Sequence, residues 1–389
     1  MNNIQKYHNH CCGCGLCAEI CPNNAIVIEE NDFGFSFPQV DVNKCNECGL
    51  CIKKCAFNQN SRNQRECTSK FLVQHKDLSI RMNSRSGGAF TALSDEIIKR
   101  NGVVYGCKLS SSFLAEHGRA NNKQSRDSFL GSKYTQSIIK DCYKRIKEDL
   151  QKGMWVLFSG TPCQVDAIKA FCRSINTDKL ILVDIVCFGI PGRKIWSDYL
   201  KSIETNFKSK IISVDFRDKK KFGWANHVET VDLENGEQYD GEIYARLFEK
   251  RLIIRDACFQ CPYKNLHRVG DITLADAWGI DEQYSDFNDN KGTSLVLVNS
   301  EKGEVLFNQT INQMEYIKLE SLNGFLQPCL KDNWSKPDNY NDFWNDCLQM
   351  SFDDLANKYT SMSVKSIVNS KKDKNENLFR KIIRKMKLS

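Results

Sequence analysis

The sequence has no long hydrophobic run, which argues against a membrane-spanning helix. Its most apolar stretch, residues 180–190, is short and contains Asp184, so it predicts a buried strand. The first ten residues are polar and do not resemble a secretory signal. We therefore expect a cytoplasmic protein.

Most of the chain also lacks an excess of positive charge. The net charge is +7, but residues 371–389 carry +6 of it, from eight Lys or Arg and two acidic residues. Residues 1–370 are therefore nearly neutral in total, which argues against a nucleic-acid partner. Apolar residues follow one face of the predicted helix 378–388, a pattern that fits peripheral membrane contact, a docking helix or a solvated basic end.

Nineteen cysteines without an export signal indicate metal or redox chemistry rather than disulfides. Two runs have the spacing C-x2-C-x2-C-x3-C of bacterial two-cluster ferredoxins, where the fourth cysteine of each run binds the other cluster. We therefore assign one 4Fe–4S cluster to Cys11, Cys14, Cys17 and Cys55, and a second to Cys45, Cys48, Cys51 and Cys21.

A zinc ribbon is the alternative for paired C-x2-C motifs, but zinc needs four ligands and not eight in two identical runs. Small residues at Gly13, Gly15 and Gly49 would let backbone amides approach the clusters. The runs are separated by alternating residues around 31–34, which predict a hairpin. Cys12 has no place in the motif and is interpreted as a spare loop cysteine.

The sequence predicts a ferredoxin-like α+β module over residues 1–60, followed by a linker at 61–78. Strand and helix patterns then alternate over 79–330, as in a mixed, largely parallel α/β domain. A helical segment is expected over 331–370, and the basic amphipathic tail over 371–389.

Two glycine turns in the α/β domain suggest a bound cofactor. Ser86-Gly87-Gly88 opens a predicted helix, where backbone amides can hold a phosphate, although an ordinary helix cap also fits. The turn before Cys163 follows a predicted strand, and ligands bind at such strand ends. Cys163, Cys187, Cys258 and Cys261 are candidates for a third cluster or are separate buried thiols. Five other cysteines are assigned to packing: Cys107, Cys142, Cys172, Cys329 and Cys347.

Taken in order, these motifs resemble the family of coenzyme F420 hydrogenase/dehydrogenase beta subunits, in a version with a fused ferredoxin. The matching stretches are Ser86–Phe90 (SGGAF), Gly102–Gly106 (GVVYG), Gly131–Tyr134 (GSKY), Gly160–Gln164 (GTPCQ), Val186–Gly189 (VCFG), Phe216–Lys219 (FRDK), Asp271–Leu274 with Trp278-Gly279, and Gly292–Ser294. The resemblance implies FAD, and a third 4Fe–4S cluster on Cys163, Cys187, Cys258 and Cys261. Phe188 stands where relatives often have His.

The resemblance further implies a flavin site formed by Ser86, Gly87, Gly88, Ser132, Lys133, Tyr134 and Thr161. Lys133, Tyr134 and Lys219 are candidate catalytic groups around the flavin or substrate, with solvated surface charge as the alternative. We expect an oxidoreductase that exchanges electrons, in either direction, between a small molecule and a redox partner such as reduced ferredoxin or reduced deazaflavin. The family context suggests surface-polysaccharide biosynthesis. An electron-delivery subunit is the main alternative, and a non-catalytic iron–sulfur sensor is a weaker one.

Overall fold

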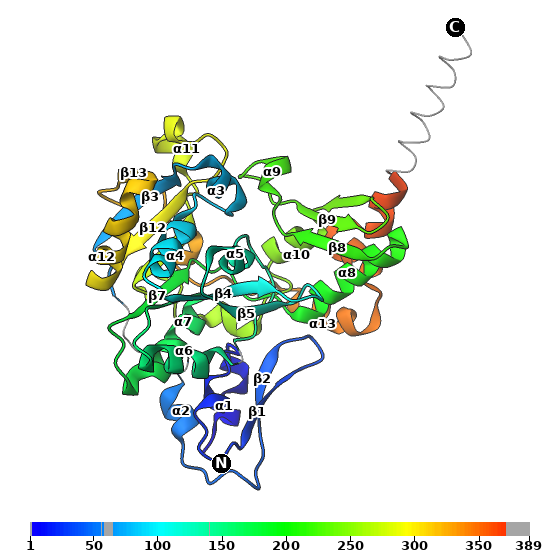
Figure 1. Cartoon of the computed structure of the whole chain (residues 1–389). Coiled ribbons are helices and arrows are strands. Elements are labelled where there is room, and N and C mark those ends of the chain that lie inside the picture. The colour runs from blue at the N-terminus through cyan, green and yellow to red at the C-terminus, as the bar shows by residue number, and fades with distance from the viewer. Residues whose placement is uncertain (1, 56, 58–64, 140, 371–389) are drawn as a thin grey trace.

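The computed structural model describes residues 2–55, 57, 65–139 and 141–370. Figure 1 shows the N-terminal module at one end of the molecule, below a large mixed sheet, with a smaller sheet and the C-terminal helices to one side. The predicted tail, residues 371–389, lies outside the described residues. In the described part of the chain, no helix combines the length and apolar character needed to cross a membrane.

The N-terminal module consists of a 3-10 helix (Ile4–His10), two short α-helices and a hairpin. Helices α1 (Leu16–Glu19) and α2 (Leu50–Lys54) each begin after a glycine with positive φ, Gly15 and Gly49. Strands β1 (Ile26–Glu30) and β2 (Ser36–Val40) pair antiparallel, as the alternating pattern predicts. The module is therefore the ferredoxin-type unit expected from its cysteine spacing.

The large sheet has eight strands within the described residues, in the order β13-β3-β12-β11-β7-β6-β4-β5. The neighbours β11, β7, β6 and β4 run parallel, whereas the strands on either side of them pair antiparallel. The fold is thus mixed α/β, with its parallel strands confined to the centre. The strand bounds are β3 Ser69–His75, β4 Val103–Leu109, β5 Ala115–Ala120, β6 Val156–Gly160, β7 Leu180–Ile185, β11 Ile272–Asp276, β12 Ser294–Val298 and β13 Met314–Lys318.

Two boundaries differ from the sequence-based prediction. The expected linker 61–78 contains strand β3, which pairs with β12 and β13 inside the large sheet, so the α/β domain includes residues before 79. Residues 137–150 have the apolar spacing of an amphipathic helix, but α6 begins only at Cys142, because Ile138 pairs with Glu116 beside the sheet. In both cases a long-range pairing overrode the local pattern.

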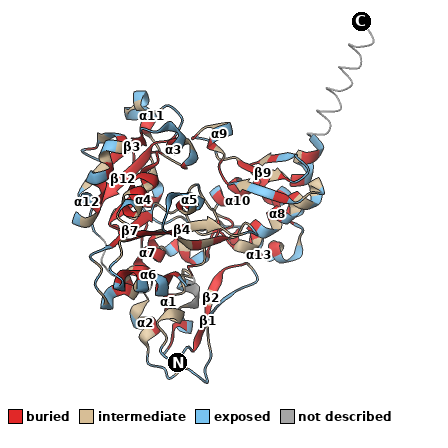
Figure 2. Cartoon of the chain, viewed as in Figure 1, coloured by how far each residue is buried: buried red, intermediate tan, exposed pale blue. Residues whose placement is uncertain are grey.

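Helices cover both faces of the sheet. One core contains Leu93 of α4 and Phe307 of α12, and another contains Ile146 of α6 and Ile168 of α7. Figure 2 shows buried residues concentrated in the strands. The helices after the N-terminal module are α3 Leu78–Asn83, α4 Ala89–Lys99, α5 Lys123–Arg126, α6 Cys142–Gln151, α7 Pro162–Phe171, α8 Arg193–Phe207, α9 Lys219–Phe222, α10 Ile243–Glu249, α11 Ile280–Gln283, α12 Glu301–Thr310, α13 Tyr340–Gln349 and α14 Phe352–Thr360.

The smaller sheet has the order β10-β9-β8, with β8 Ile211–Asp215, β9 Glu229–Leu233 and β10 Gln238–Gly241. It shares a core with α8, α10, α13 and α14, so the predicted segment 331–370 packs onto the α/β domain. This core also contains Phe35 from the N-terminal hairpin.

The N-terminal module is docked tightly on the α/β domain. Leu16 of α1 packs in the core formed by α6 and α7. At the hairpin tip, a Cβ on Gly34 would collide with the backbone nitrogen of Lys194, so no larger side chain fits there. Arg193 forms an ion pair with Glu30 across the same contact. The module is therefore held at a fixed position relative to the parallel strands.

Candidate iron–sulfur and flavin site

The first ferredoxin motif surrounds a small cavity. Cys11, Cys14, Cys17 and Cys55 all line it, together with Gly13 and Gly15. These four cysteines are the set that the spacing assigns to one cluster, including the distant Cys55. Gly13 has a positive φ of 72°, and its backbone amide donates to the Cys11 sulfur at 3.3 Å. The loop thus presents both sulfur and backbone N–H groups to the cavity.

The second set lies nearer the surface. Cys48 is exposed, Cys45 is partly buried and Cys51 is buried. The Cys21 sulfur accepts a hydrogen bond from the Ala25 amide at 3.3 Å. Because Cys48 is exposed, we call the second set the outer set. We call the first set the inner set, because Cys14 and the neighbouring Leu16 pack against the core of the α/β domain.

The four cysteines predicted for a third cluster come together at the ends of central strands. Cys163 lies in the first turn of α7, directly after β6, and Cys187 follows β7. Cys258 lies in a 3-10 helix, Asp256–Gln260, and Cys261 follows it. Burial and the proximity of the other three cysteines raise the pKa of Cys187 well above its usual value. The structure therefore groups all four thiols in one region, where each cysteine is partly buried.

In the described part of the chain, no group of three or more His, Cys, Asp or Glu side chains is arranged to hold a metal ion. By residue type, four cysteine thiolates are the ligand set of a 4Fe–4S cluster.

A buried cation beside this region supports a negatively charged occupant. Lys264 is 6% exposed, and its Nζ atom has no hydrogen-bond partner among the described residues. Burial lowers the pKa of Lys264, and the thiols of Cys329, Cys258, Cys261 and Cys187 oppose that shift by Coulombic attraction. A buried ammonium without a hydrogen-bond partner is costly, and four thiolates of a bound cluster would compensate for its charge.

Two cysteines that the sequence analysis dismissed also lie here. Cys329, assigned to packing, is close enough to Cys187 to affect its pKa. Cys12, interpreted as a spare thiol, lines the cavity of the first motif, and the nearby thiols of Cys14 and Cys163 raise the pKa of Cys12 well above its usual value. No spacing rule could identify either residue, because their neighbours come from distant parts of the chain.

The predicted flavin residues fall into three groups. The turn Ser86-Gly87-Gly88 is wedged between β3 and β12, where a Cβ on Gly87 would collide with the Val73 carbonyl oxygen. Lys219 joins this turn, since its Nζ donates to the carbonyl oxygens of Ser86 at 3.1 Å, Arg81 at 2.5 Å and Lys291 at 2.8 Å. The structure thus brings Lys219 to the Ser86 turn.

The second group is Ser132, Lys133 and Tyr134. Lys133 turns back on its own loop and donates to the carbonyl oxygen of Leu130 at 2.6 Å, and burial lowers the pKa of Lys133 to about 8. The Tyr134 hydroxyl accepts a hydrogen bond from Arg217 at 3.4 Å. Thr161 stands apart from both groups, because its hydroxyl lies 3.2 Å from the Cys163 sulfur.

Arginines missed by the sequence analysis connect the first two groups. Arg85 donates to the backbone carbonyl of Arg217 at 3.2 Å, and Arg217 forms an ion pair with Asp276 at 3.2 Å. Burial and repulsion from Arg217 lower the pKa of Arg85, whose Nε atom finds no hydrogen-bond partner in the part of the chain that the structure describes. Arg85, Arg217 and Lys219 therefore form a cationic group suited to an anion. Arg217 belongs to the FRDK stretch, but only its contacts in the structure show that it lies between Arg85 and Tyr134.

Trp224 and Trp278 stack on each other beside this group. Their ring centroids are 4.7 Å apart and their planes are nearly parallel, at 10°. The Trp224 indole donates to Asp276 at 3.0 Å. The two rings thus cover one face of each other, an arrangement typical of core packing.

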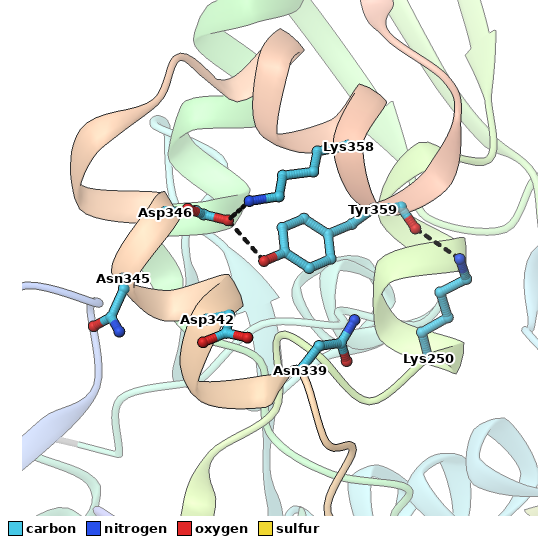
Figure 3. A pocket seen from close by; sticks show the side chains of 7 residues that line it. All are labelled: Lys250, Asn339, Asp342, Asn345, Asp346, Lys358 and Tyr359. Carbon is cyan, nitrogen blue, oxygen red and sulfur yellow. Dashed lines mark hydrogen bonds and ion pairs between the residues drawn. The ribbon is translucent and has the colours of Figure 1, made fainter.

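A separate open pocket of about 580 Å³ lies among the C-terminal helices (Figure 3). Within it, Asp346 accepts from Lys358 at 2.5 Å and from the Tyr359 hydroxyl at 2.7 Å, and Lys250 donates to the Tyr359 carbonyl oxygen at 2.6 Å. None of the predicted site residues lines it. This pocket is therefore not part of the candidate site.

Comparison with known proteins supports both halves of this description. Residues 153–324 match the model of the C-terminal part of the coenzyme F420 hydrogenase/dehydrogenase beta subunit, and residues 10–59 match a 4Fe-4S dicluster domain. The F subunit of the F(420)H(2) dehydrogenase of Methanosarcina mazei is 19% identical to this chain, over 80% of this chain and 85% of its own length.

Two further similarities cover different shares of the chain. The B subunit of the Na(+)-translocating ferredoxin:NAD(+) oxidoreductase complex of Acetobacterium woodii is 44% identical over 45 residues, 12% of either chain. A solved chain of the F420-reducing [NiFe] hydrogenase complex from Methanosarcina barkeri has a TM-score of 0.47 and 16% identity, covering 77% of this chain and 92% of that chain. The predicted family resemblance and the dicluster module are confirmed by the family models.

Proposed function

For an iron–sulfur protein related to the F420 hydrogenase/dehydrogenase beta subunits, we propose an oxidoreductase that couples three 4Fe–4S clusters to FAD and a small-molecule substrate. The clusters move single electrons, and a flavin exchanges them for electron pairs. Surface-polysaccharide biosynthesis remains our suggestion for the substrate's context.

One observation carries this proposal: the cysteine groups form a continuous series. The outer set ends at exposed Cys48, and Cys12 and Cys14 of the first motif loop lie close enough to Cys163 to shift the pKa of its thiol. Thr161, at the start of α7, touches the Cys163 sulfur. Electron transfer requires redox centres that lie close together, and this series supports a path from the surface into the α/β domain.

The chain's own residues would hold the flavin by charge. Arg85, Arg217 and Lys219 supply positive charge beside the Ser86 turn, where FAD carries a diphosphate to be neutralised. Gly88 has a φ of 90° and caps the start of α4, whose first-turn N–H groups have no partner within the helix. Tyr134, oriented by Arg217, is our candidate for holding a proton near the substrate.

The alternative is an electron-delivery subunit that reduces a partner protein. It is favoured by the names of two relatives, which are a subunit of a dehydrogenase and a subunit of an oxidoreductase complex. Turnover of a small molecule by the isolated chain would favour the enzyme, whereas reduction only of an added protein partner would favour delivery.

Anaerobic purification tests the cofactor content. We expect about twelve irons and one FAD per chain, measured by iron analysis and by the absorbance of released flavin. Eight irons without flavin would reduce the proposal to the dicluster module. A screen of reduced ferredoxin, reduced deazaflavin and NADH as donors would then identify the source of electrons.

We also predict that FAD binding depends on Lys219 and on pH. Burial lowers the pKa of Lys219 to about 7, and repulsion from Arg85 and Arg81 lowers it further than burial alone would. Attraction to Asp276 and Asp289 partly opposes this shift. The side chain is therefore cationic below pH 7 and neutral above it. Because FAD is anionic, its affinity for the flavin-depleted protein should fall about tenfold between pH 6 and pH 8.

The matched pair for this prediction is Lys219→Gln and Lys220→Gln. Lys219→Gln should abolish the pH dependence in a fluorescence titration with FAD. Lys220 is exposed on the same helix, so its replacement should leave the pH profile unchanged. A pH profile that persists in Lys219→Gln would contradict the assignment.

A further inference from the structure

His227 and Glu249 form a hydrogen-bonded pair that the proposed function does not use. His227 lies in the loop before β9, and Glu249 is the last residue of α10. The Nδ1 atom of the imidazole and the Oε1 atom of Glu249 are 3.2 Å apart. The glutamate side chain is 60% exposed, whereas the imidazole is only 15% exposed. The pair therefore reaches from the protein surface towards the interior.

The second ring nitrogen of His227 is buried and unmatched. Its Nε2 atom finds no hydrogen-bond partner within the part of the chain that the structure describes. Buried polar atoms are normally hydrogen-bonded, and a catalytic role is one of the reasons why an atom departs from that rule. An ionised carboxylate can only accept hydrogen bonds, so the hydrogen of the neutral ring is assigned to Nδ1, facing Glu249. This tautomer leaves a lone pair on Nε2.

The neighbours of His227 place its ring against the candidate flavin and substrate site. The Tyr134 ring lies beside the imidazole, with 5.0 Å between the two ring centroids. Arg217 donates to the Tyr134 hydroxyl at 3.4 Å and also to the carbonyl oxygen of Asn226, the residue before His227, at 3.4 Å. Tyr134 and Arg217 already belong to the proposed site. His227 therefore adds a titratable group to the same wall of that site.

The charges around His227 favour a neutral ring at pH 7. Burial lowers the pKa of His227 below its ordinary value, repulsion from Arg217 and Arg85 adds to this shift, and Glu249 opposes it. Hydrogen bonding to His227 in turn lowers the pKa of Glu249. Tyr134 is a further titratable group in contact with the ring. A neutral imidazole oriented by an ionised carboxylate is the arrangement that general-base catalysis uses.

We propose that Nε2 of His227 is the proton acceptor of this oxidoreductase, and that Glu249 is the positioning residue that fixes its tautomer. This inference rests on the FAD and the small-molecule substrate of the proposed function. The matching donor class loses a hydride from carbon and a proton from a nitrogen or oxygen of the same molecule, as reduced deazaflavin or an alcohol does. NADH falls outside this class, because its oxidation releases a hydride and no proton.

The step balances in atoms and electrons. A C–H bond of the donor breaks, and its hydrogen leaves with both bonding electrons as a hydride to FAD. An N–H or O–H bond of the donor breaks as an N–H bond forms at Nε2, which makes the imidazole a cation held by Glu249. In total the donor loses two electrons and two protons. The electrons leave singly through the clusters, and both protons end in water. In the opposite direction the imidazolium returns its proton to the substrate.

The test uses full-length, anaerobically purified protein saturated with FAD, mixed in a stopped-flow instrument with reduced deazaflavin or with dithionite. In His227→Gln we expect flavin reduction by reduced deazaflavin to slow about a hundredfold, because a positioned base contributes about 10²–10⁴-fold. Reduction by dithionite should be unchanged, because this donor supplies electrons without releasing a proton to the protein.

The pH profile separates a proton acceptor from a merely structural residue. In the unmodified protein, the rate with reduced deazaflavin should rise with pH through the pKa of His227 and then level off, because only the neutral ring accepts a proton. In Glu249→Gln the rise should move to lower pH, since the carboxylate that opposes the downward shift is gone. Glu249 is exposed, so this variant does not disturb the core. Nuclear magnetic resonance of the histidine rings measures the same pKa without turnover.

His267→Gln and Glu242→Gln are the matched controls. His267 is exposed, and Glu242 precedes α10 and pairs with Arg246 at the surface. Both should keep the rates and the pH profile of the unmodified protein. An unchanged rate and profile in His227→Gln, or equal slowing with dithionite, would overturn the inference. Failure of reduced deazaflavin to reduce a chain that holds FAD and about twelve irons would also overturn it. A chain that binds no FAD would instead remove the proposed function.

Discussion

Replacing Cys163 with alanine is expected to remove about four irons per chain and to leave about eight in place. Cys163 lies in the first turn of α7, beside Cys187, Cys258 and Cys261. Losing one of four thiolates would open the proposed third cluster, whereas the eight motif cysteines of the ferredoxin module are untouched. Electron transfer from the ferredoxin clusters to a bound flavin should therefore stop.

The matched control is Cys172→Ala, at the other end of α7. Cys172 is also buried, at 1% exposed, but burial raises the pKa of its thiol and Lys147 opposes that shift, with no other cysteine among the causes. It should keep full iron content and lose only a small amount of stability. Iron analysis and the spectrum of the reduced protein measure both variants. Full iron retention in Cys163→Ala would refute the third site.

Replacing Arg255 with methionine is expected to weaken the junction between the ferredoxin module and the α/β domain. Arg255 is 2% exposed and donates to the Ser36 carbonyl oxygen at 2.9 Å and to Gln136 Oε1 at 3.3 Å, as well as to the Cys11 carbonyl. Its guanidinium also lies 3.9 Å from the ring centroid of Phe37. Leaving these buried acceptors unsatisfied should lower the free energy of unfolding by about 3 kcal/mol.

Arg255 should also affect the redox potential of the inner cluster. Burial raises the pKa of the Cys11 thiol, and the positive charge of Arg255 opposes that shift. A cation beside the cluster favours the added electron, so Arg255→Met should lower the midpoint potential of that cluster.

Two further variants separate the structural and electrostatic roles of Arg255. Arg255→Lys keeps the charge but not the planar fork, so it should lose stability and retain most of the potential. Arg246→Met, an exposed control whose ion pair is with Glu242, should change neither property measurably. Denaturation curves and redox titrations provide the two measurements. Equal potentials in the Met and Lys variants would exclude the electrostatic role.

Some boundaries and site residues could not be predicted from local pattern. Strand β3 was not predicted within the linker 61–78. This strand depends on pairing with β12 and β13, which come more than two hundred residues later in the chain. Arg85 and Lys264 gave no signal in the sequence, since an isolated basic residue is normally exposed. Their buried nitrogens, which lack hydrogen-bond partners among the described residues, became visible only when the surrounding elements were packed.

By itself, the sequence predicted the ferredoxin module and the resemblance to the family. The spacing of eight cysteines within 45 residues places their sulfurs through local loop geometry, which needs no distant contact. Only the tertiary structure brought Cys12 to Cys163, Lys264 to the third cysteine group and Lys219 to the Ser86 turn. Those contacts join segments that are distant in the sequence, and their proximity depends on how the strands order within the sheet, which no short-range spacing encodes.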